Sequence, residues 1–261
     1  NGVISIGNDA FKGCSSLTSI NIPDGVTTIG EWAFGDCFSL TSINIPDSVT
    51  TIGNYAFSEC AALQCLNIPN SVTCIGVNAF YGCTGFNGKL TLPKNIKTIG
   101  THAFRECKFT GELYLPEGVS TVGVFAFSGC NFTGTLRLPQ TLTSIARSAF
   151  RECDFSEVVF HSSVADIGAQ AFYGCDKLEA VYFDGDAPEI IAYNSENTGS
   201  FTADVTLYCR PGASGWTDSA YYDAERGTYK GYKLELWPDA EVFTLTASIT
   251  TYNPRISATV T

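Results

Sequence analysis

The dipeptide Ala-Phe recurs along this chain at an almost constant interval, and that interval limits the folds open to the sequence. Eight phenylalanines follow one another at spacings of 23, 23, 23, 24, 23, 23 and 22 residues, and a cysteine stands three positions after each. The phenylalanines are Phe11, Phe34, Phe57, Phe80, Phe104, Phe127, Phe150 and Phe172. The cysteines are Cys14, Cys37, Cys60, Cys83, Cys107, Cys130, Cys153 and Cys175. A repeat of this length predicts a solenoid, in which each unit forms one turn of a coil.

The unit itself reads as two short extended pieces. Leu40–Cys60, for example, is LTSINIPDSVTTIGNYAFSEC. Apolar and polar residues alternate over Leu40–Ile45, as in a strand with one buried face, and Pro46 ends that strand. Val49–Gly53 then forms a second extended piece on the opposite side of the coil. Because one unit is too small to bury its own apolar side chains, stacked units must bury them as continuous ladders. We therefore predict a mainly β repeat solenoid of about eight units.

A glycine closes the second extended piece in seven units. A turn with positive φ, or a close approach between two backbones, would require glycine there. Ala146 replaces the glycine in one unit, so that turn either is strained or tolerates a Cβ atom. The glycines are Gly7, Gly30, Gly53, Gly76, Gly100, Gly123 and Gly168.

The segment Ser39–Cys60, SLTSINIPDSVTTIGNYAFSEC, resembles the BspA-like leucine-rich repeats of bacterial and some protist surface proteins. Copies of this motif cover about residues 1–183. The segment Leu207–Trp237 resembles, more loosely, the region that closes such solenoids. The resemblance implies a right-handed leucine-rich-repeat coil, a cell-surface or extracellular location, and adhesion to host or microbial partners.

The period fails after Phe183, and we divide the chain there. Residues 1–183 are predicted to form the solenoid, residues 184–238 a C-terminal cap, and residues 239–261 a β tail or the start of a following domain. The cap is expected to contain a strand at Val205–Cys209 and to cover the last coil with aromatic side chains; a separate binding module is the alternative. The aromatic residues are Trp216, Tyr221, Tyr222, Tyr229, Tyr232 and Trp237.

The two ends of the chain give further expectations. Val242–Thr250 and Ile256–Thr261 are predicted to be strands, separated by a turn at Asn253-Pro254. The chain starts inside a repeat, so the native protein is expected to extend further upstream.

Charge and hydropathy exclude two classes of partner. The 261 residues carry a formal net charge of −11, whereas nucleic-acid-binding proteins concentrate Lys and Arg on one face. The sequence contains no apolar run of 18 residues, so no segment is predicted to insert into a membrane. We predict neither a nucleic acid nor a membrane as partner.

The eight aligned cysteines suggest metal ligation, disulfide bonds or burial. No Cys-x-x-Cys pair occurs, which argues against a metal site. Neighbouring thiols in a ladder point in parallel rather than toward each other, which argues against disulfides. We predict free, buried thiols that each fill one rung. Cys65, Cys74 and Cys209 lie outside the ladder.

The chain offers few groups for catalysis. Its two histidines, His102 and His161, fall at different positions of the repeat and belong to no Ser-His-Asp arrangement. Asp184-Gly185-Asp186 resembles part of a calcium loop but lacks the remaining ligand spacing, so we interpret it as a turn. We predict no enzymatic activity, no cofactor and no metal site.

One residue of each predicted strand points outward between two buried aliphatic side chains. In the first four repeats these residues are Asn21, Asn44, Asn67 and Thr91, and in the last four they are Tyr114, Arg137, Val159 and Tyr182. Aromatic side chains and arginine are typical of binding hot spots. We predict a ligand-binding strip of Tyr114, Arg137, Val159 and Tyr182, bordered by Glu112 and Glu157. Sequence drift on a solvated face is the alternative.

Two further interpretations concern surfaces and function. Trp32, Tyr55 and Phe125 form a second aromatic column, which we interpret as covering the edge of the core. The leading functional hypothesis is a non-catalytic, secreted or surface-attached adhesion module that binds a protein. The alternatives are a glycan-binding module and a structural spacer that projects another domain.

Overall fold

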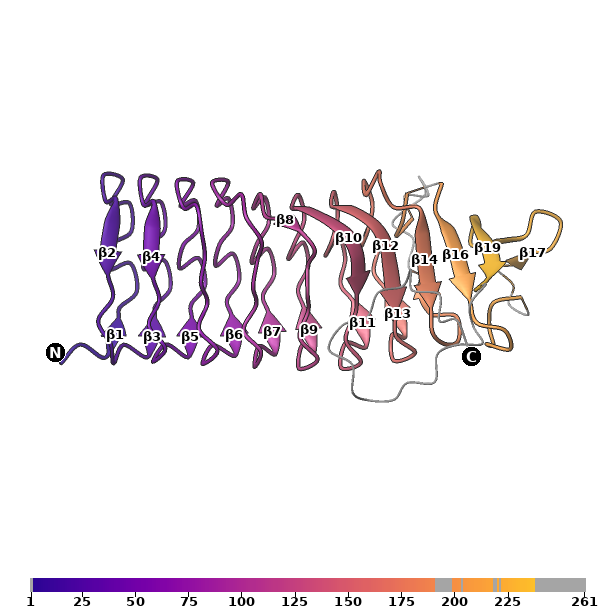
Figure 1. The fold of residues 1–261 in the computed structure, drawn as a ribbon, viewed down its shortest axis with the longest axis horizontal. Coiled ribbons are helices and arrows are strands. Elements are labelled where there is room, and N and C mark those ends of the chain that lie inside the picture. Colours follow the sequence, from indigo (N-terminus) through magenta and orange to yellow (C-terminus); the bar gives the residue numbers. More distant parts are fainter. Residues whose placement is uncertain (1, 191–198, 203, 218–219, 221, 238–261) are drawn as a thin grey trace, which may run out of the picture.

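The computed structural model describes residues 2–190, 199–202, 204–217, 220 and 222–237. These residues form one elongated stack of coils (Figure 1), which confirms the predicted β solenoid. No helix is present among them, and none of their segments could cross a membrane as an apolar helix. We number the coils by the eight Ala-Phe pairs, and each coil includes the strand that follows its phenylalanine.

Strands run along two sides of the stack. The first side, which we call the principal sheet, carries a two-stranded sheet of β2 (Ser19–Asn21) and β4 (Ser42–Asn44) and an eight-stranded sheet that includes β8 (Thr110–Gly111), β10 (Asn131–Arg137), β12 (Asp154–Phe160), β14 (Ala180–Phe183), β16 (Thr206–Cys209) and β19 (Tyr232–Leu236). The other side, which we call the second sheet, carries a six-stranded sheet of β1 (Ser5–Ile6), β3 (Thr28–Ile29), β5 (Thr51–Ile52), β6 (Cys74–Ile75), β7 (Thr98–Ile99) and β9 (Thr121–Val122) and a three-stranded sheet of β11 (Ser144–Ile145), β13 (Asp166–Ile167) and β15 (Glu189–Ile190). Neighbouring strands are parallel until the C-terminal end, where β17 (Tyr222–Asp223), β18 (Thr228–Tyr229) and β19 pair antiparallel. Coils three and four form no principal-sheet strand over 61–69 and 87–92, although the repeat predicted one in each.

The Ala-Phe turn joins consecutive coils by backbone hydrogen bonds. The amide of Phe34 donates to the carbonyl oxygen of Ala56 in the next coil at 2.8 Å, and the same bond recurs down the stack. Two residues per turn adopt left-handed backbone angles, for example Trp32 at φ 54° and Asp36 at φ 62°. Because each turn repeats the same angles, its outward side chains line up in columns.

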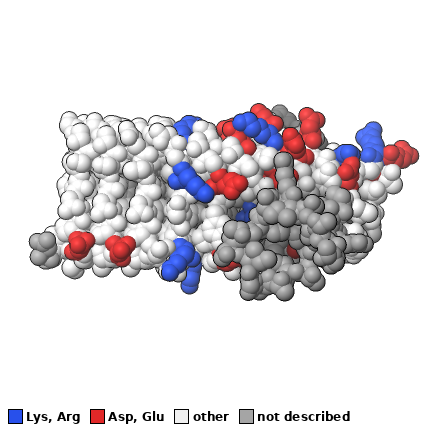
Figure 2. Space-filling model, viewed as in Figure 1, with Lys and Arg blue, Asp and Glu red and all other residues white. Residues whose placement is uncertain are grey.

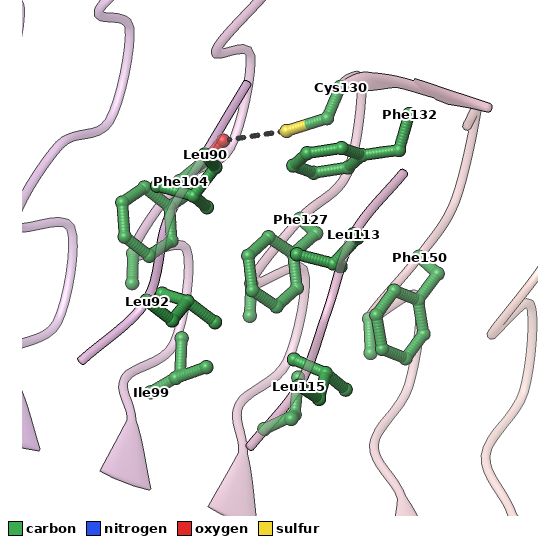
Figure 3. Close-up of a cluster of buried hydrophobic side chains, with 14 of the residues drawn as sticks. Leu90, Leu92, Ile99, Phe104, Leu113, Leu115, Phe127, Cys130, Phe132 and Phe150 are labelled. Atoms are coloured by element: carbon green, nitrogen blue, oxygen red, sulfur yellow. Dashed lines mark hydrogen bonds between the residues drawn. The ribbon is translucent and has the colours of Figure 1, made fainter. Parts of the chain in front are cut away.

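The phenylalanines of these turns form the predicted internal ladder. Consecutive rings stack with centroids 5.1 Å apart at Phe11–Phe34 and 5.2 Å apart at Phe34–Phe57. A second aromatic ladder, which the sequence analysis missed, runs through Phe86, Phe109, Phe132 and Phe155. Its rings contact the first ladder edge-on, as at Phe127–Phe132 with centroids 5.9 Å apart (Figure 3).

The cysteine ladder is buried from Cys37 onward, and the thiols are free, as predicted. Each thiol also has a role that the sequence did not suggest: its Sγ donates to the phenylalanine carbonyl of the preceding coil, as from Cys130 to Phe104 at 3.2 Å (Figure 3). Burial raises the pKa of six of these thiols, and that of Cys175 rises to about 12; the six are Cys37, Cys60, Cys107, Cys130, Cys153 and Cys175. The prediction was wrong for Cys14, which is exposed because no coil covers it.

Close backbone approach explains the repeated glycines. They do not have positive φ. A Cβ atom on Gly53 would lie 2.7 Å from the carbonyl carbon of Gly30, and one on Gly76 would lie 2.6 Å from that of Gly53. Ala146 shows that one coil accepts a methyl group at this position.

The ladders continue beyond Phe183 into a ninth coil. Ile190 pairs with Ile167 in the second sheet, Phe201 stacks on Phe172 with centroids 5.5 Å apart, and Leu207 is fully buried in β16. β16 also confirms the predicted strand at Val205–Cys209. The segment assigned to the cap therefore contributes one more turn of the coil before the chain reverses.

A tyrosine hydroxyl ends the stack. Tyr232 Oη accepts the amide hydrogen of Phe201 and donates to the carbonyl oxygen of the same residue, both at 3.2 Å. It thus replaces both partners that a further coil would supply. Gly199 leaves room for this hydroxyl, because a Cβ there would lie 1.8 Å from Tyr232 Oη. Trp216 and Tyr229 are also buried, and their ring centroids lie 5.0 Å apart.

Several sequence expectations lie outside the described residues. They are the strands Val242–Thr250 and Ile256–Thr261, the turn at Asn253-Pro254, and Tyr221 of the cap.

Candidate functional site

The principal sheet aligns the four residues of the predicted strip. Tyr114 pairs with Arg137, Arg137 with Val159, and Val159 with Tyr182, each on adjacent parallel strands. Residues paired in this way present their side chains on the same face of the sheet. Tyr114 is the most exposed of them, at 67% of its surface.

The two bordering glutamates occupy the neighbouring column. Glu157 pairs with Thr135, and its carboxylate accepts a hydrogen bond from the Thr135 hydroxyl at 2.8 Å. Glu112 is exposed and lies beside Gly134, where a Cβ would approach the Glu112 Cγ to 3.1 Å. The register of β10 shifts between Gly134 and Thr135. Glu157 therefore lies beside Thr135, whereas Glu112 lies beside Gly134, on the other side of this shift.

The strip extends further than the sequence predicted. Tyr208 of the ninth coil pairs with Tyr182, and their rings stack with centroids 5.0 Å apart. The Trp237 ring lies 5.1 Å from that of Tyr182, so Trp237 sits on the sheet face rather than within the cap where we had placed it. We call Tyr114, Arg137, Val159, Tyr182 and Tyr208 the sheet strip. The sequence signal for Tyr208 was the alternation in TLYC, which matches AVYF one coil earlier.

Charged groups surround the C-terminal end of the sheet strip. The Arg210 guanidinium lies 5.0 Å from the centre of the Trp237 ring and forms an ion pair with Asp184. Burial raises the pKa of Tyr208, and the nearby Glu235 carboxylate raises it further. At this end of the sheet strip, the Trp237 ring therefore contacts the Arg210 cation, and Tyr208 lies near the Glu235 carboxylate.

The same face of the first coils is uncharged. Its outward columns carry Asn21, Asn44 and Asn67 beside Ser19 and Ser42, and the asparagines are exposed. Residues 1–88 contain six acidic and one basic residue, out of 26 and 15 in the whole chain. Figure 2 shows the contrast: the N-terminal half of this face is nearly free of charge, and charged side chains gather farther along.

The second aromatic column lies outside the principal sheet. The rings of Trp32 and Tyr55 stack with centroids 4.4 Å apart, and the Lys12 ammonium lies 3.8 Å from the Trp32 ring centre. His102 stacks on Phe125 in the same way. Because these rings cover one another's faces, the column fits the interpretation that it shields the edge of the core.

The remaining chemical groups of interest are held in structural contacts. Burial, with the charge of Arg105, lowers the pKa of His102. Asp186 accepts the amide hydrogen of Ser214 at 2.7 Å, consistent with the turn predicted at Asp184-Gly185-Asp186. Within the described ranges, no group of three or more His, Cys, Asp or Glu side chains could hold a metal ion.

Repeat length, ladder and turn geometry agree with one family. The model of the BspA-type leucine-rich repeat region matches six copies, over residues 1–110 and 99–206. The chain belongs to the BspA-type leucine-rich repeat family. Among curated proteins, none matches this BspA-type chain.

Three solved bacterial proteins illustrate the structural relationship. A leucine-rich repeat protein from Bacteroides ovatus is 28% identical over 90% of this chain, with a TM-score of 0.58. The chain spans 64% of that protein's length. The T. pallidum leucine-rich repeat protein is 25% identical over 67% of this chain and 72% of its own, with a TM-score of 0.45. A leucine-rich cell surface protein from Faecalibacterium prausnitzii is 21% identical over 90% of this chain and 83% of its own, with a TM-score of 0.43.

Proposed function

We propose that this BspA-type chain is a non-catalytic adhesion module, at the cell surface or secreted, that binds a protein partner through the sheet strip. The observation that carries the proposal is the single register column from Tyr114 to Tyr208. Aromatic and arginine side chains anchor many protein interfaces because they combine large apolar area with directed hydrogen bonds. Parallel strands also hold these side chains in fixed positions, which lowers the entropic cost of binding.

The test compares two triple variants at matched positions. Tyr114→Ala/Arg137→Ala/Tyr182→Ala removes the anchors of coils five, six and eight. Asn21→Ala/Asn44→Ala/Asn67→Ala removes the corresponding side chains of coils one to three. Both variants and the wild type are screened against arrayed, purified host and bacterial surface proteins, and the affinity of each hit is measured by biolayer interferometry.

We expect the anchor variant to weaken binding by at least about 30-fold, which corresponds to roughly 2 kcal/mol from lost hot-spot contacts. The asparagine variant should bind like the wild type. The asparagine variant should also keep the wild-type unfolding midpoint, because exposed substitutions change stability little. The anchor variant loses the ring contacts of Tyr182 with Tyr208 and Trp237, so its affinity is measured well below its own unfolding midpoint. An anchor variant that folds normally and binds with unchanged affinity would reject the sheet strip as the interface.

A second candidate function is glycan binding by the aromatic cluster of Tyr182, Tyr208 and Trp237. Sugars stack on open ring faces, and the tilt of 39° between Trp237 and Tyr182 leaves part of each ring available. Tyr182 and Tyr208, however, cover each other at an interplanar angle of 18°, which favours the protein partner. A glycan array separates the two: sugar hits lost on Trp237→Ala but kept on Tyr114→Ala would favour the glycan. A chain with no hit in either screen would fit the spacer hypothesis.

A further inference from the structure

A second surface, outside the sheet strip, is formed by the pairs of residues that follow the ladder phenylalanines. In coils four to eight these pairs are Tyr81-Gly82, Arg105-Glu106, Ser128-Gly129, Arg151-Glu152 and Tyr173-Gly174. The order is symmetric about coil six: a small pair, flanked by two Arg-Glu pairs, flanked by two Tyr-Gly pairs. Three of the pairs directly follow Phe104, Phe127 and Phe150, whose buried rings give them a common rigid base (Figure 3).

A hollow of about 280 Å³ opens at the centre of this pattern. Ser128 and Gly129 lie between Arg105 on one side and Arg151 on the other, and Phe125 contributes an apolar wall. The two arginines are two coils apart, which places their backbones about 10 Å apart at the usual strand spacing. The neighbouring coils carry Glu106 and Glu152 at the position of Gly129, and because Gly129 has no side chain the hollow stays open between these two glutamates.

The lining of the hollow carries no net negative charge, although the protein as a whole is acidic. Arg105 and Arg151 each pair with the glutamate that follows, at 3.1 Å and 2.9 Å. Lys108 adds a third cation, because its Nζ donates to the Gly129 carbonyl oxygen at 3.1 Å. Two arginines and two glutamates therefore line the hollow with balanced charge, and the Lys108 ammonium lies beside it, whereas the whole chain has a net charge of −11.

Arg105 retains unused hydrogen-bonding capacity. Its guanidinium lies 5.2 Å from the centre of the Phe125 ring and 5.8 Å from that of Tyr81, and these rings hold it in position. Its Nε atom is buried and has no hydrogen-bond partner. A guanidinium held in this way can donate further hydrogen bonds to a carboxylate.

We propose that this hollow binds a carboxylate group carried on a scaffold the size of one sugar or one amino-acid residue. Arg105, Arg151 and Lys108 would hold the carboxylate, and Phe125 would contact the apolar side of the scaffold. The site is independent of the sheet strip, so either proposal can fail without the other.

The experiment titrates the whole chain with two carboxylate probes, glucuronate and N-acetylaspartate, by isothermal titration calorimetry. Glucose and N-acetylasparagine are their uncharged counterparts. The test variant is Arg105→Gln/Arg151→Gln. The control variant, Lys94→Gln/Lys97→Gln, removes the same charge from two exposed lysines that do not line the hollow.

We expect saturable binding of at least one carboxylate, weakened by added salt, and roughly tenfold weaker in the arginine variant than in the control. Glucuronate alone would indicate an acidic glycan, N-acetylaspartate alone an acidic peptide, and both a general carboxylate site. Equal binding of a carboxylate and its neutral counterpart would overturn the proposal, as would equal binding by the two variants. If the double variant does not fold, Arg151→Lys provides the comparison, because it keeps the charge and removes the guanidinium.

Discussion

In coils one to three the outward column of the principal sheet carries Asn21, Asn44 and Asn67, whereas in coils five to eight it carries Tyr114, Arg137, Val159 and Tyr182. The interior differs as well. Leu17, Leu40 and Leu63 fill a position in the early coils that Phe109, Phe132 and Phe155 fill in coils five to seven. The later coils therefore combine a larger buried aromatic volume with longer strands, such as β10 and β12 of seven residues each.

One coil geometry therefore supports two kinds of outward sheet face. The hydrogen bonds between turns and the first phenylalanine ladder are the same in both regions. Outward side chains are not needed for that framework, so the sheet face can vary from uncharged and small to aromatic and charged. Coils five to eight carry both proposed sites, and coils one to three serve as an internal control.

The largest loss of stability is expected where the two aromatic ladders contact each other. Phe127→Ala in coil six should lower the free energy of unfolding by about 3–5 kcal/mol, and more than Phe34→Ala in coil two, because Phe127 also loses its edge contact with Phe132. Urea unfolding of both variants measures the difference. Phe132→Leu, which gives coil six the residue type of coil two, should cost about 1 kcal/mol. Equal losses at Phe34 and Phe127 would show that the second ladder adds nothing.

The next effect tests the glycine contacts between coils. Gly76→Ala should cost about 1–3 kcal/mol, because its methyl group would lie 2.6 Å from the Gly53 carbonyl carbon and would force the coils apart. The reverse change in coil six, Ala146→Gly, should cost less than about 1 kcal/mol. Thermal unfolding of both variants measures these losses of stability. A Gly76→Ala protein as stable as the wild type would refute the close-approach explanation.

The third effect concerns the thiols at alkaline pH. Because burial raises the pKa of Cys175 from 9.0 to about 12, the folded state keeps a proton there that the unfolded state releases. Below pH 9 this thiol makes its full contribution to the free energy of unfolding. As the pH rises from 9 toward 12, that contribution should fall by up to about 1.4 kcal/mol per pH unit. Cys175→Ala should make the alkaline slope shallower by that amount in urea titrations at several pH values, and the other buried thiols should retain their own share of it. At neutral pH, maleimide should label Cys14 and Cys65, which are exposed, and spare Cys175; labelling of Cys175 in the folded protein would contradict its burial.

The smallest effect lies in the ninth coil. Tyr232→Phe removes the hydroxyl that satisfies the Phe201 amide and carbonyl, and should cost about 1 kcal/mol. Hydrogen exchange at the Phe201 amide should accelerate, while the Phe34 amide, bonded to Ala56 in coil three, keeps its wild-type protection. Unchanged exchange at Phe201 would mean that another group satisfies its amide.

Sequence reasoning recovered the features that depend on period. Equal spacing fixes which residues share a column, so the first phenylalanine ladder, the buried thiols and the alignment of Tyr114 with Tyr182 all followed from counting. The thiol bonds to phenylalanine carbonyls did not, because they depend on the offset between a side chain and the neighbouring backbone.

Features that depend on packing or on irregular spacing were missed. Phe201 follows Phe172 by 29 residues, which departs from the repeat spacing, so the repeat pattern did not predict the ninth coil or the position of Tyr208. The edge contacts of Phe132 and the hollow beside Arg105 involve side-chain directions that no periodic pattern specifies. Whether the sheet strip binds a partner stays a prediction, since shape alone does not identify a ligand.

The hydrogen bonds at Tyr232 affect whether copies of this molecule can associate end to end. A parallel β stack offers its terminal strand as a template on which a further strand can add, which in principle allows uncontrolled end-to-end polymerisation. Here the Tyr232 hydroxyl bonds both the amide and the carbonyl oxygen of Phe201. In addition, β17, β18 and β19 pair antiparallel, so the strand direction alternates at this end of the sheet. An incoming parallel coil would meet neither free hydrogen-bonding groups at Phe201 nor a continuous strand orientation, so the ninth coil is a poor template for a further parallel coil.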